Sequence, residues 1–226
     1  MSSCDITKEK VRVCVCAPLA LFSDSTDEEK ATERVSQRFG EAQRSRILAK
    51  KNRQDRLLSL GGLEALGKIV GQECARLSRA ELGKPFFADK TLGGLSISHS
   101  WEISVAACGP CEIGVDIENI GRDLDFQKLS DRFFSKAERD RLISDGMTAE
   151  SFYKIWTSKE AYVKYTGEGI GGLRATDGIA DVIFKRFFVE YNGERYIMSL
   201  CTPNDIETEI IVMNGDVAVY EIQSRT

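Results

Sequence analysis

The spacing of hydrophobic and polar residues divides the chain into short segments with strand periodicity and longer segments with helical periodicity. A period of two predicts strands at residues 12–17, 95–98, 103–107, 113–117, 181–191, 195–200, 209–213 and 217–222. Residues 27–50 are charged and compatible with a helix, apolar residues at helical spacing predict a helix at about 53–80, and residues 126–134, 136–143 and 148–166 also look helical. Strands and helices thus follow one another along the whole chain.

Glycine and proline positions refine this outline. Gly61-Gly62 should weaken the helix over residues 53–80, and Pro85 favours an extended segment near residues 82–87. Asn192-Gly193 and Asn214-Gly215 each predict a tight hairpin turn between neighbouring strands. Gly167 is placed to end the last helix.

The order of a strand, helices and further strands occurs roughly twice. We therefore expect an α+β fold made of two similar α/β halves packed as one pseudo-symmetric unit. The chain has 226 residues and no low-complexity linker, so the expected lobes are residues 1–110 and 111–226, joined closely near residues 109–112.

Charge and composition limit the classes of partner. The net charge of −4 gives no support for a general nucleic-acid binder, and no apolar run is long enough to span a bilayer. Residues 30–56 nevertheless carry nine Lys or Arg against three acids, which indicates a specific anionic ligand or partner unless the stretch is an ordinary solvated helix face. The first residues lack a secretory signal, so we expect a cytoplasmic protein. We also expect a monomer that binds neither nucleic acid nor membrane.

Seven cysteines are scattered through the chain, and their odd number argues against a disulfide framework. Cys108-Gly-Pro-Cys111 has the form of a thiol redox motif. That chemistry needs the first cysteine at a helix N-terminus, whereas here the motif lies between two predicted strands, which favours a turn with two incidental thiols. Gly167, Gly169 and Gly172 match a dinucleotide-loop spacing, but they follow a helix rather than a strand.

Two carboxylates lie on one face of the predicted strand at residues 113–117. Because side chains alternate along a strand, Ile113, Val115 and Ile117 point one way. Asp116 and Glu118 point the other way, beside Gly114, which would let a ligand approach the backbone. A polar solvent face is the plain alternative. With Glu160 from the helix at 148–166 as a third carboxylate, these oxygens suit Mg²⁺.

The helix at residues 148–166 has an apolar stripe that includes Phe152, Trp156 and Val163. Lys159 falls inside this stripe, so its ammonium must reach water or find a partner. Glu160 and Lys164 are four residues apart, and a surface ion pair between them is the bland alternative to a functional role.

Several segments together resemble the 4′-phosphopantetheinyl transferases of the two-lobed, surfactin-synthetase-activating (Sfp) type. The segments are Lys84-Pro85, Ser98-His99-Ser100, Gly114-Val-Asp-Ile-Glu118 and Trp156-x-x-Lys-Glu160-Ala-x-x-Lys164. The resemblance covers about residues 44–172. It fits the short trimeric holo-carrier-protein synthases of the same superfamily less well, because this chain supplies both lobes itself.

This resemblance implies a role for each matching residue. Asp116, Glu118 and Glu160 would hold Mg²⁺ against the pyrophosphate of coenzyme A. Ser98, His99 and Lys164 would contact phosphates, and Lys84 would approach the adenosine end. Ser59 matches a hydroxyl that touches phosphate, but Leu58 stands where the family commonly has a basic residue, so Arg44, Arg46 or Arg56 would substitute.

The resemblance also implies a reaction. The chain would transfer 4′-phosphopantetheine from coenzyme A to a serine of an acyl- or peptidyl-carrier protein and release 3′,5′-ADP. Glu160, or a metal-bound water that it orients, is the first candidate to deprotonate the serine, and Lys164 is the alternative base. The sequence does not choose between them.

Residues 121–135 are the expected docking segment for the carrier. They supply apolar side chains, such as Phe126 and Phe133, and positive charge for an acidic helix, such as Arg122 and Arg132, although some of the phenylalanines must be core. Two rival functions remain at this stage. One is a coenzyme A or nucleotide-binding module without catalysis, and the other is a thiol oxidoreductase using Cys108 and Cys111.

Overall fold

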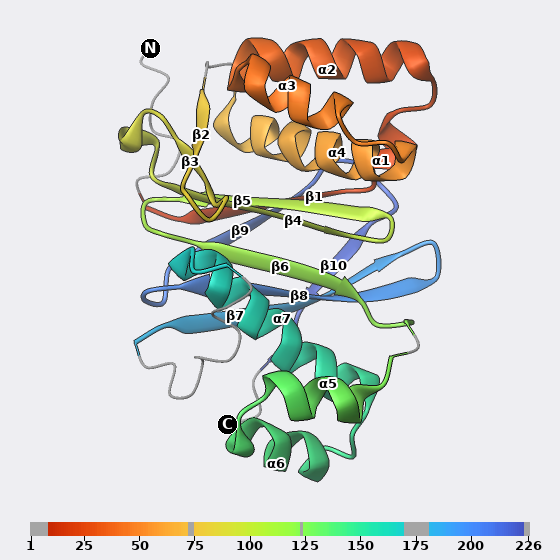
Figure 1. Ribbon diagram of the computed structural model, residues 1–226, viewed down its shortest axis with the longest axis vertical. Coiled ribbons are helices and arrows are strands. Elements are labelled where there is room, and N and C mark those ends of the chain that lie inside the picture. The colour runs from red at the N-terminus through yellow and green to blue at the C-terminus, as the bar shows by residue number, and fades with distance from the viewer. Residues whose placement is uncertain (1–8, 72–74, 123, 170–180, 224–226) are drawn as a thin grey trace.

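A computed structural model describes residues 9–71, 75–122, 124–169 and 181–223. Cys4, Cys74 and Gly172 lie outside these ranges. Two four-stranded sheets form the centre of the molecule (Figure 1). The first sheet has the strand order β4 (Gly94–Ser100), β5 (Ile103–Gly109), β1 (Val11–Cys16) and β9 (Thr208–Val212). The second has the order β10 (Ala218–Glu221), β7 (Ile183–Tyr191), β8 (Glu194–Thr202) and β6 (Gly114–Asn119).

Helices cover the outer face of each sheet. The first sheet carries α1 (Pro18–Leu21), α2 (Ser25–Phe39), α3 (Glu41–Leu48) and α4 (Arg53–Val70), and the second carries α5 (Phe126–Phe133), α6 (Lys136–Ser144) and α7 (Ala149–Thr166) (Figure 1). A small ribbon of β2 (Leu77–Arg79) and β3 (Pro85–Phe87), followed by the 3₁₀ turn η1 (Lys90–Leu92), lies at one end. These layers confirm the predicted α+β fold class.

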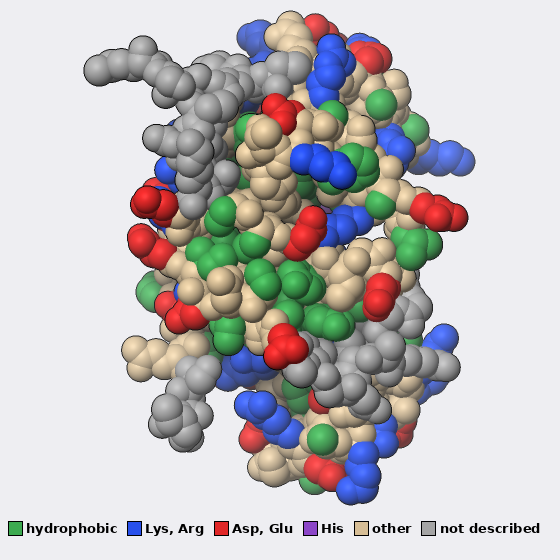
Figure 2. Space-filling view, turned by 90° about the vertical axis from the view of Figure 1, so that its left-hand side faces the viewer, with side chains coloured by type: hydrophobic (Ala, Val, Ile, Leu, Met, Phe, Trp, Pro, Cys, Tyr) green, Lys and Arg blue, Asp and Glu red, His purple; other side chains and the backbone are tan. Residues whose placement is uncertain are grey.

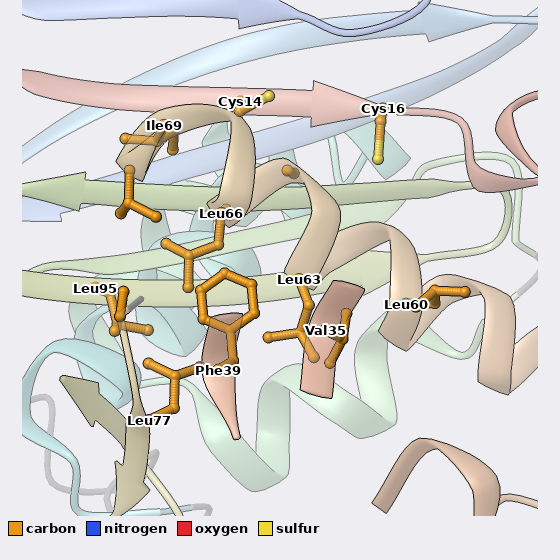
Figure 3. Packing of buried hydrophobic residues seen from close by; sticks show 14 of the residues in the cluster. Cys14, Cys16, Val35, Phe39, Leu60, Leu63, Leu66, Ile69, Leu77 and Leu95 are labelled. Atoms are coloured by element: carbon orange, nitrogen blue, oxygen red, sulfur yellow. The ribbon is translucent and has the colours of Figure 1, made fainter. Parts of the chain in front are cut away.

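Three hydrophobic clusters hold the layers together. One joins the first sheet to its helices, with Phe39, Leu63 and Leu66 packed together (Figure 3). A second lies between the sheets and takes alternate residues from β1, β5, β6 and β8, and a third packs the aromatic side chains of α5 and α7 against the second sheet. Figure 2 shows hydrophobic side chains gathered at mid-height on one side, with charged side chains around them and toward the top and bottom of the molecule.

Two predictions about the helix over residues 53–80, which is α4 in the structure, need correction. The helix does not weaken at Gly61-Gly62, because these positions face neighbouring elements closely: an added Cβ at Gly61 would lie 2.3 Å from Pro18, and one at Gly62 would lie 2.6 Å from Ile97. The helix also ends earlier than predicted, at Val70. Gly71 follows with a φ of 74°, and the chain then enters β2.

The two predicted hairpins had different outcomes. Asn192 and Gly193 have positive φ values of 51° and 78° and connect the antiparallel pair β7 and β8, as predicted. Asn214-Gly215 does not form a hairpin, because β9 pairs in parallel with β1 while β10 pairs with β7 in the other sheet. The Asn214 side chain instead bonds the backbone of Ala17 at 3.0 and 3.1 Å.

The division into lobes at residues 110 and 111 remains a prediction. The chain does cross from the first sheet to the second between β5 and β6, but β9 returns from the later segment to the first sheet. In the described part of the chain, no helix is long and apolar enough to cross a membrane.

Candidate active site

The edge strands of the two sheets, β4 and β6, meet along a seam of serine hydroxyl groups. Ser96 and Ser100 accept hydrogen bonds from the backbone N–H groups of Val115 at 3.0 Å and Asn119 at 3.1 Å. Between them, Ser98 donates to Asp116 Oδ1 at 2.8 Å. Two of the hydroxyls thus bond backbone N–H groups at the β6 edge that would otherwise lack a strand partner, and the third bonds a carboxylate of β6. The seam places the strand carboxylates beside the first sheet.

Asp116 is the most buried carboxylate of the seam, with 3% of its surface exposed. Lys164 Nζ lies 2.7 Å from Asp116 Oδ1 and donates also to Ser98 Oγ at 2.7 Å. The other oxygen, Oδ2, is buried and has no hydrogen-bond partner among the described residues. A buried carboxylate oxygen without a donor is costly, so this atom is a natural ligand for a bound cation.

Glu118 and Glu160 extend this negative charge on either side of Asp116. Burial raises the pKa of Glu160 to about 7, and the charges of Asp116 and Glu118 add to that effect while Lys164 opposes it. Burial and the nearby Asp116 also raise the pKa of Glu118, which accepts a bond from Ser100 Oγ at 2.8 Å. Arg122 lies 3.6 Å from the same oxygen of Glu118. The three carboxylates therefore repel one another, and the positive charge of Lys164 acts on all three.

Within the described ranges, no three His, Cys, Asp or Glu side chains are already spaced as a metal-binding group. Lys164 lies on Asp116 Oδ1, so this candidate ligand oxygen already has a cationic partner. The candidate ligands nevertheless suit a hard divalent cation, because all of them are carboxylate oxygens. One of these oxygens has no hydrogen-bond partner among the described residues, and the raised pKa values of Glu118 and Glu160 show that their negative charges lack sufficient compensation.

Local sequence explains why α7 can carry two of these residues. Thr148 caps its first turn by accepting a bond from Ser151 N at 3.1 Å, and Gly167 ends it with a left-handed φ of 78°. Lys159, buried to 2% exposure, pairs with Glu138 of α6 at 2.8 Å, so the predicted need for a partner is confirmed. Its neighbour Glu160 lies close enough to Asp116 of β6 for the two charges to interact.

Gly114 has a different role from the one predicted. An added Cβ at this position would lie 1.8 Å from the carbonyl oxygen of Ala161 and 2.6 Å from the backbone nitrogen of Tyr165. The backbone of α7, and not a ligand, fills the space beside the glycine. Gly114 therefore sets the close approach of α7 to β6, and with it the spacing between Glu160 and Asp116.

Lys84 lies at the end of the seam where β4 begins. Its ammonium donates to Glu112 at 2.5 Å and to the carbonyl oxygen of Tyr165, in the last turn of α7, at 2.6 Å. A cavity of about 220 Å³ next to it is lined by Lys84, Lys164, Ser96, Gly167 and others. Two ammonium groups beside one cavity give a place for an anionic group.

Ser98 and His99 point to opposite faces of β4. His99 is exposed along one edge, on the side of Ile97 and α4. Enough protein surrounds its ring that desolvation lowers the pKa of His99, and the positive charges of Lys164 and Lys50 lower it further. The charge of Asp55 in α4 acts on His99. Ser59 lies one helical turn after Asp55, so it faces the same side of β4 as His99. The structure therefore separates Ser59 and His99 from the seam face of β4.

The predicted basic residues of α3 and α4 lie in another place. Arg44 and Arg56 line a cavity of about 350 Å³ between α2, α3 and α4, together with Glu28 and Glu29. Arg44 donates to Glu41 at 2.9 Å, and Arg56 donates to backbone carbonyls at residues 50 and 51. The positive charge of Arg46 acts on Arg79 of β2. None of these three arginines is among the residues that line the cavity beside Lys84.

The cysteines do not form a redox site among the described residues. Cys108 is fully buried at the end of β5, and burial raises the pKa of its thiol to about 12. Burial and the charge of Glu112 also raise the pKa of Cys111. A reactive thiol needs a lowered pKa, so the oxidoreductase alternative loses its chemical basis.

Sequence reasoning missed Ser96 and Ser100 as seam residues. A signal was present, because serines at positions 96, 98 and 100 share one face of a strand. The role of that face depends on the contact between the β4 and β6 edges, which belong to two different sheets. Local sequence does not reveal this contact.

Comparison with known proteins finds one superfamily. Residues 112–208 match the family model of the 4′-phosphopantetheinyl transferase superfamily. The chain is 36% identical over 120 residues to the 4′-phosphopantetheinyl transferase HetI of Nostoc sp., which covers 50% of this chain and 49% of that protein. It is 35% identical over 97 residues to the 4′-phosphopantetheinyl transferase ffp of Bacillus subtilis, with 42% of each chain covered.

A third relative is the 4′-phosphopantetheinyl transferase AcpT of Escherichia coli O157:H7, which is 36% identical over 126 residues, 54% of this chain and 64% of that protein. The chain thus spans about half the length of the first two relatives. The matched region holds β6 and α7, and therefore Asp116, Glu118, Glu160 and Lys164. The comparisons confirm the resemblance carried by the motifs: this chain is similar to the 4′-phosphopantetheinyl transferases.

Proposed function

We propose that this protein transfers 4′-phosphopantetheine from coenzyme A to a serine of an acyl- or peptidyl-carrier protein, in a magnesium-dependent reaction that releases 3′,5′-ADP. The observation that carries the proposal is the buried Oδ2 of Asp116, which has no hydrogen-bond partner in the described part of the chain and lies among the charges of Glu118, Glu160 and Lys164. The similarity to named transferases over this same region supports it. A cytoplasmic location and a monomeric state are part of the proposal.

Asp116, Glu118 and Glu160 would hold the magnesium ion. When bound, the ion neutralises negative charge that develops on the pyrophosphate. Lys164 now donates to Asp116 and Ser98, so it is placed to transfer one of these bonds to a phosphate oxygen once the carboxylates have a stronger cation. Lys84 would do the same at the far end of the cavity.

Glu160 is the better candidate for the base that deprotonates the acceptor serine. Without a bound metal ion, burial and the charge of Asp116 raise the pKa of Glu160 to about 7, so its carboxylate can take up a proton near neutral pH. The protons of Lys164 are already donated to Asp116 and Ser98, which makes this ammonium a positioning group. His99, whose pKa is lowered, would approach the ligand as a neutral ring from the α4 side of β4.

The rival binding module without catalysis would require the loss of a metal carboxylate, and all three are present in the sequence. Arg44, Arg46, Arg56 and Ser59 remain proposed contacts for the coenzyme. If these arginines hold coenzyme A, neutralising them should raise the KM for coenzyme A. If they dock the carrier, the KM for the carrier should rise instead.

The carrier would dock on the segment from residue 121 to residue 135. The side chains of Phe126, Phe133 and Phe134 pack against Phe152 and Trp156, as expected for core residues. The basic side chains of this segment are exposed, so they can meet an acidic partner: Arg122, Lys128 and Arg132.

The test is to incubate the protein with coenzyme A, Mg²⁺ and apo-carriers from fatty-acid, polyketide and nonribosomal-peptide systems, and to read the intact mass of each carrier. We expect at least one carrier to gain the phosphopantetheine mass with the wild type. Asp116→Ala should give no transfer while its circular-dichroism spectrum stays unchanged. If no carrier of any class is modified, the proposal fails, and a wild-type rate in Asp116→Ala would refute the role of this carboxylate.

A further inference from the structure

The turn between β4 and β5 carries an exposed tryptophan in an unusual backbone conformation. Ser100 pairs with Ile103, so Trp101 and Glu102 form the whole loop. Trp101 has a φ of 54°, and 56% of its surface is exposed. Positive φ in such a loop favours Gly or Asn, and for a bulky side chain it is an outlier.

Fold stability does not explain this residue. An indole that is more than half exposed buries less apolar surface than a core tryptophan would, and the backbone at Trp101 is in a region that a glycine would occupy without strain. Strained residues of this kind concentrate at binding and catalytic sites. The loop is also held in place, because Gln54 of α4 donates to the carbonyl oxygen of Trp101 at 2.9 Å.

The turn lies at the Glu118 end of the seam. Ser100, the residue before Trp101, donates to Glu118, and Arg122 reaches the same carboxylate oxygen. Lys84 and its cavity lie beside the first residues of β4, Leu95 to Ile97, and therefore at the other end of the strand. An anionic ligand held by Lys84 and Lys164 would leave the Glu118 end open to a second substrate.

Basic and acidic groups both lie near the turn: Glu102 is part of the loop, Arg53 pairs with Glu28, and Arg122 pairs with Glu118. The stretch that leads into α4, from which Gln54 reaches Trp101, contains Lys50, Lys51 and Arg53. The charge of Lys50 acts on His99, two residues before Trp101. Lys50 and Lys51 thus give the α4 side of the turn a positive charge that suits an acidic protein surface.

We propose that Trp101 is a contact residue for the acceptor protein, inserting its indole into the acidic surface that presents the serine. The inference rests on the proposed function and names a docking point outside residues 121–135. Tryptophan is among the side chains whose truncation weakens protein interfaces most. The other possible occupant, the adenine ring of coenzyme A stacked on the indole, would show itself in the same experiment.

The test compares Trp101→Ala with Trp101→Gly. Both remove the indole, but only glycine relieves the positive φ, so Trp101→Gly should melt at a temperature about 2–4 °C higher than Trp101→Ala. Both should raise the KM for the apo-carrier by a similar factor, on the order of tenfold, with the KM for coenzyme A unchanged. Tyr220→Ala, which removes an aromatic ring with the same 56% exposure from β10, should change neither constant.

Two results would overturn the inference. A normal KM for the carrier in Trp101→Gly would show that the residue matters only through its backbone, and a raised KM for coenzyme A would assign the indole to the coenzyme. If the wild type modifies no carrier, the proposed function fails by itself. Binding of a fluorescently labelled apo-carrier then tests the contact, which is refuted if Trp101→Ala binds as the wild type does or if the wild type does not bind.

Discussion

Replacing Glu160 with Gln should change how the metal-free protein responds to pH. Burial and the neighbouring carboxylates raise the pKa of Glu160 from 4.5 to about 7. A raised pKa in an acid means that the folded state binds the proton more tightly than the unfolded state. This contribution to stability is fully present below pH 4.5 and is lost as the pH rises through 7. The amide of the Glu160→Gln variant cannot ionise, so the variant should not show this loss.

The size of the effect follows from the shift. Each pKa unit corresponds to about 1.4 kcal/mol, so a shift from 4.5 to about 7 sets an upper bound of about 3 kcal/mol. Because Glu160 is only partly buried, solvent screening reduces the expected difference to about 1–2 kcal/mol. Glu160→Gln should therefore be more stable than the wild type by this amount at about pH 8.5, and nearly equal to it at about pH 4.5.

Urea unfolding of both proteins in the presence of a chelator, at these two pH values, measures the difference directly. Other ionisable groups are common to both proteins, so their contributions largely cancel. Adding Mg²⁺ at about pH 8.5 should then stabilise the wild type and should stabilise Glu160→Gln much less. An offset between the two proteins that does not change with pH would refute the electrostatic account of the site.

Three further predictions concern packing and the cysteines. Gly114→Ala should lower the free energy of unfolding by about 1–3 kcal/mol, because the added Cβ would collide with the α7 backbone. The urea midpoint measures this loss, and an unchanged midpoint would contradict the prediction. Lys159→Met should cost about 2 kcal/mol in unfolding free energy, because Glu138 loses its ammonium partner and keeps only the hydrogen bond from the backbone of Ser135. Adding Glu138→Gln should restore part of this loss, and no recovery in the double variant argues against the pair. Replacing Cys108 with Ala and Cys111 with Ser should preserve most of the transfer rate, because burial raises the pKa of both thiols; lost activity with an intact circular-dichroism spectrum would revive a role for them.

Local sequence patterns were sufficient to place several candidate side chains on their elements. Strand alternation correctly put Asp116 and Glu118 on the face opposite Val115 and Ile117, which pack between the sheets. The position of Lys159 within an apolar stripe correctly required a partner for its charge. Each of these predictions concerns a single strand or helix, and the spacing of hydrophobic residues along that element is visible in the sequence.

Other features depend on elements that are distant along the chain. Glu138 as the partner of Lys159, and β9 as the parallel neighbour of β1, are set by packing that no local pattern encodes. The Asn214-Gly215 prediction failed for the same reason: the pair has turn chemistry, but the strands on its two sides belong to different sheets. Gly114 was correctly singled out, yet its neighbour proved to be a helix and not a ligand.

The central claim is that the carboxylates of the seam support phosphopantetheine transfer with a bound magnesium ion. The most direct test follows 3′,5′-ADP release and carrier modification in the same reaction, before and after the divalent cation is chelated. The account predicts one 3′,5′-ADP for each carrier modified, no reaction after chelation, and recovery when Mg²⁺ is restored. Carrier modification at an unchanged rate after chelation, or 3′,5′-ADP release without any modified carrier, would contradict it.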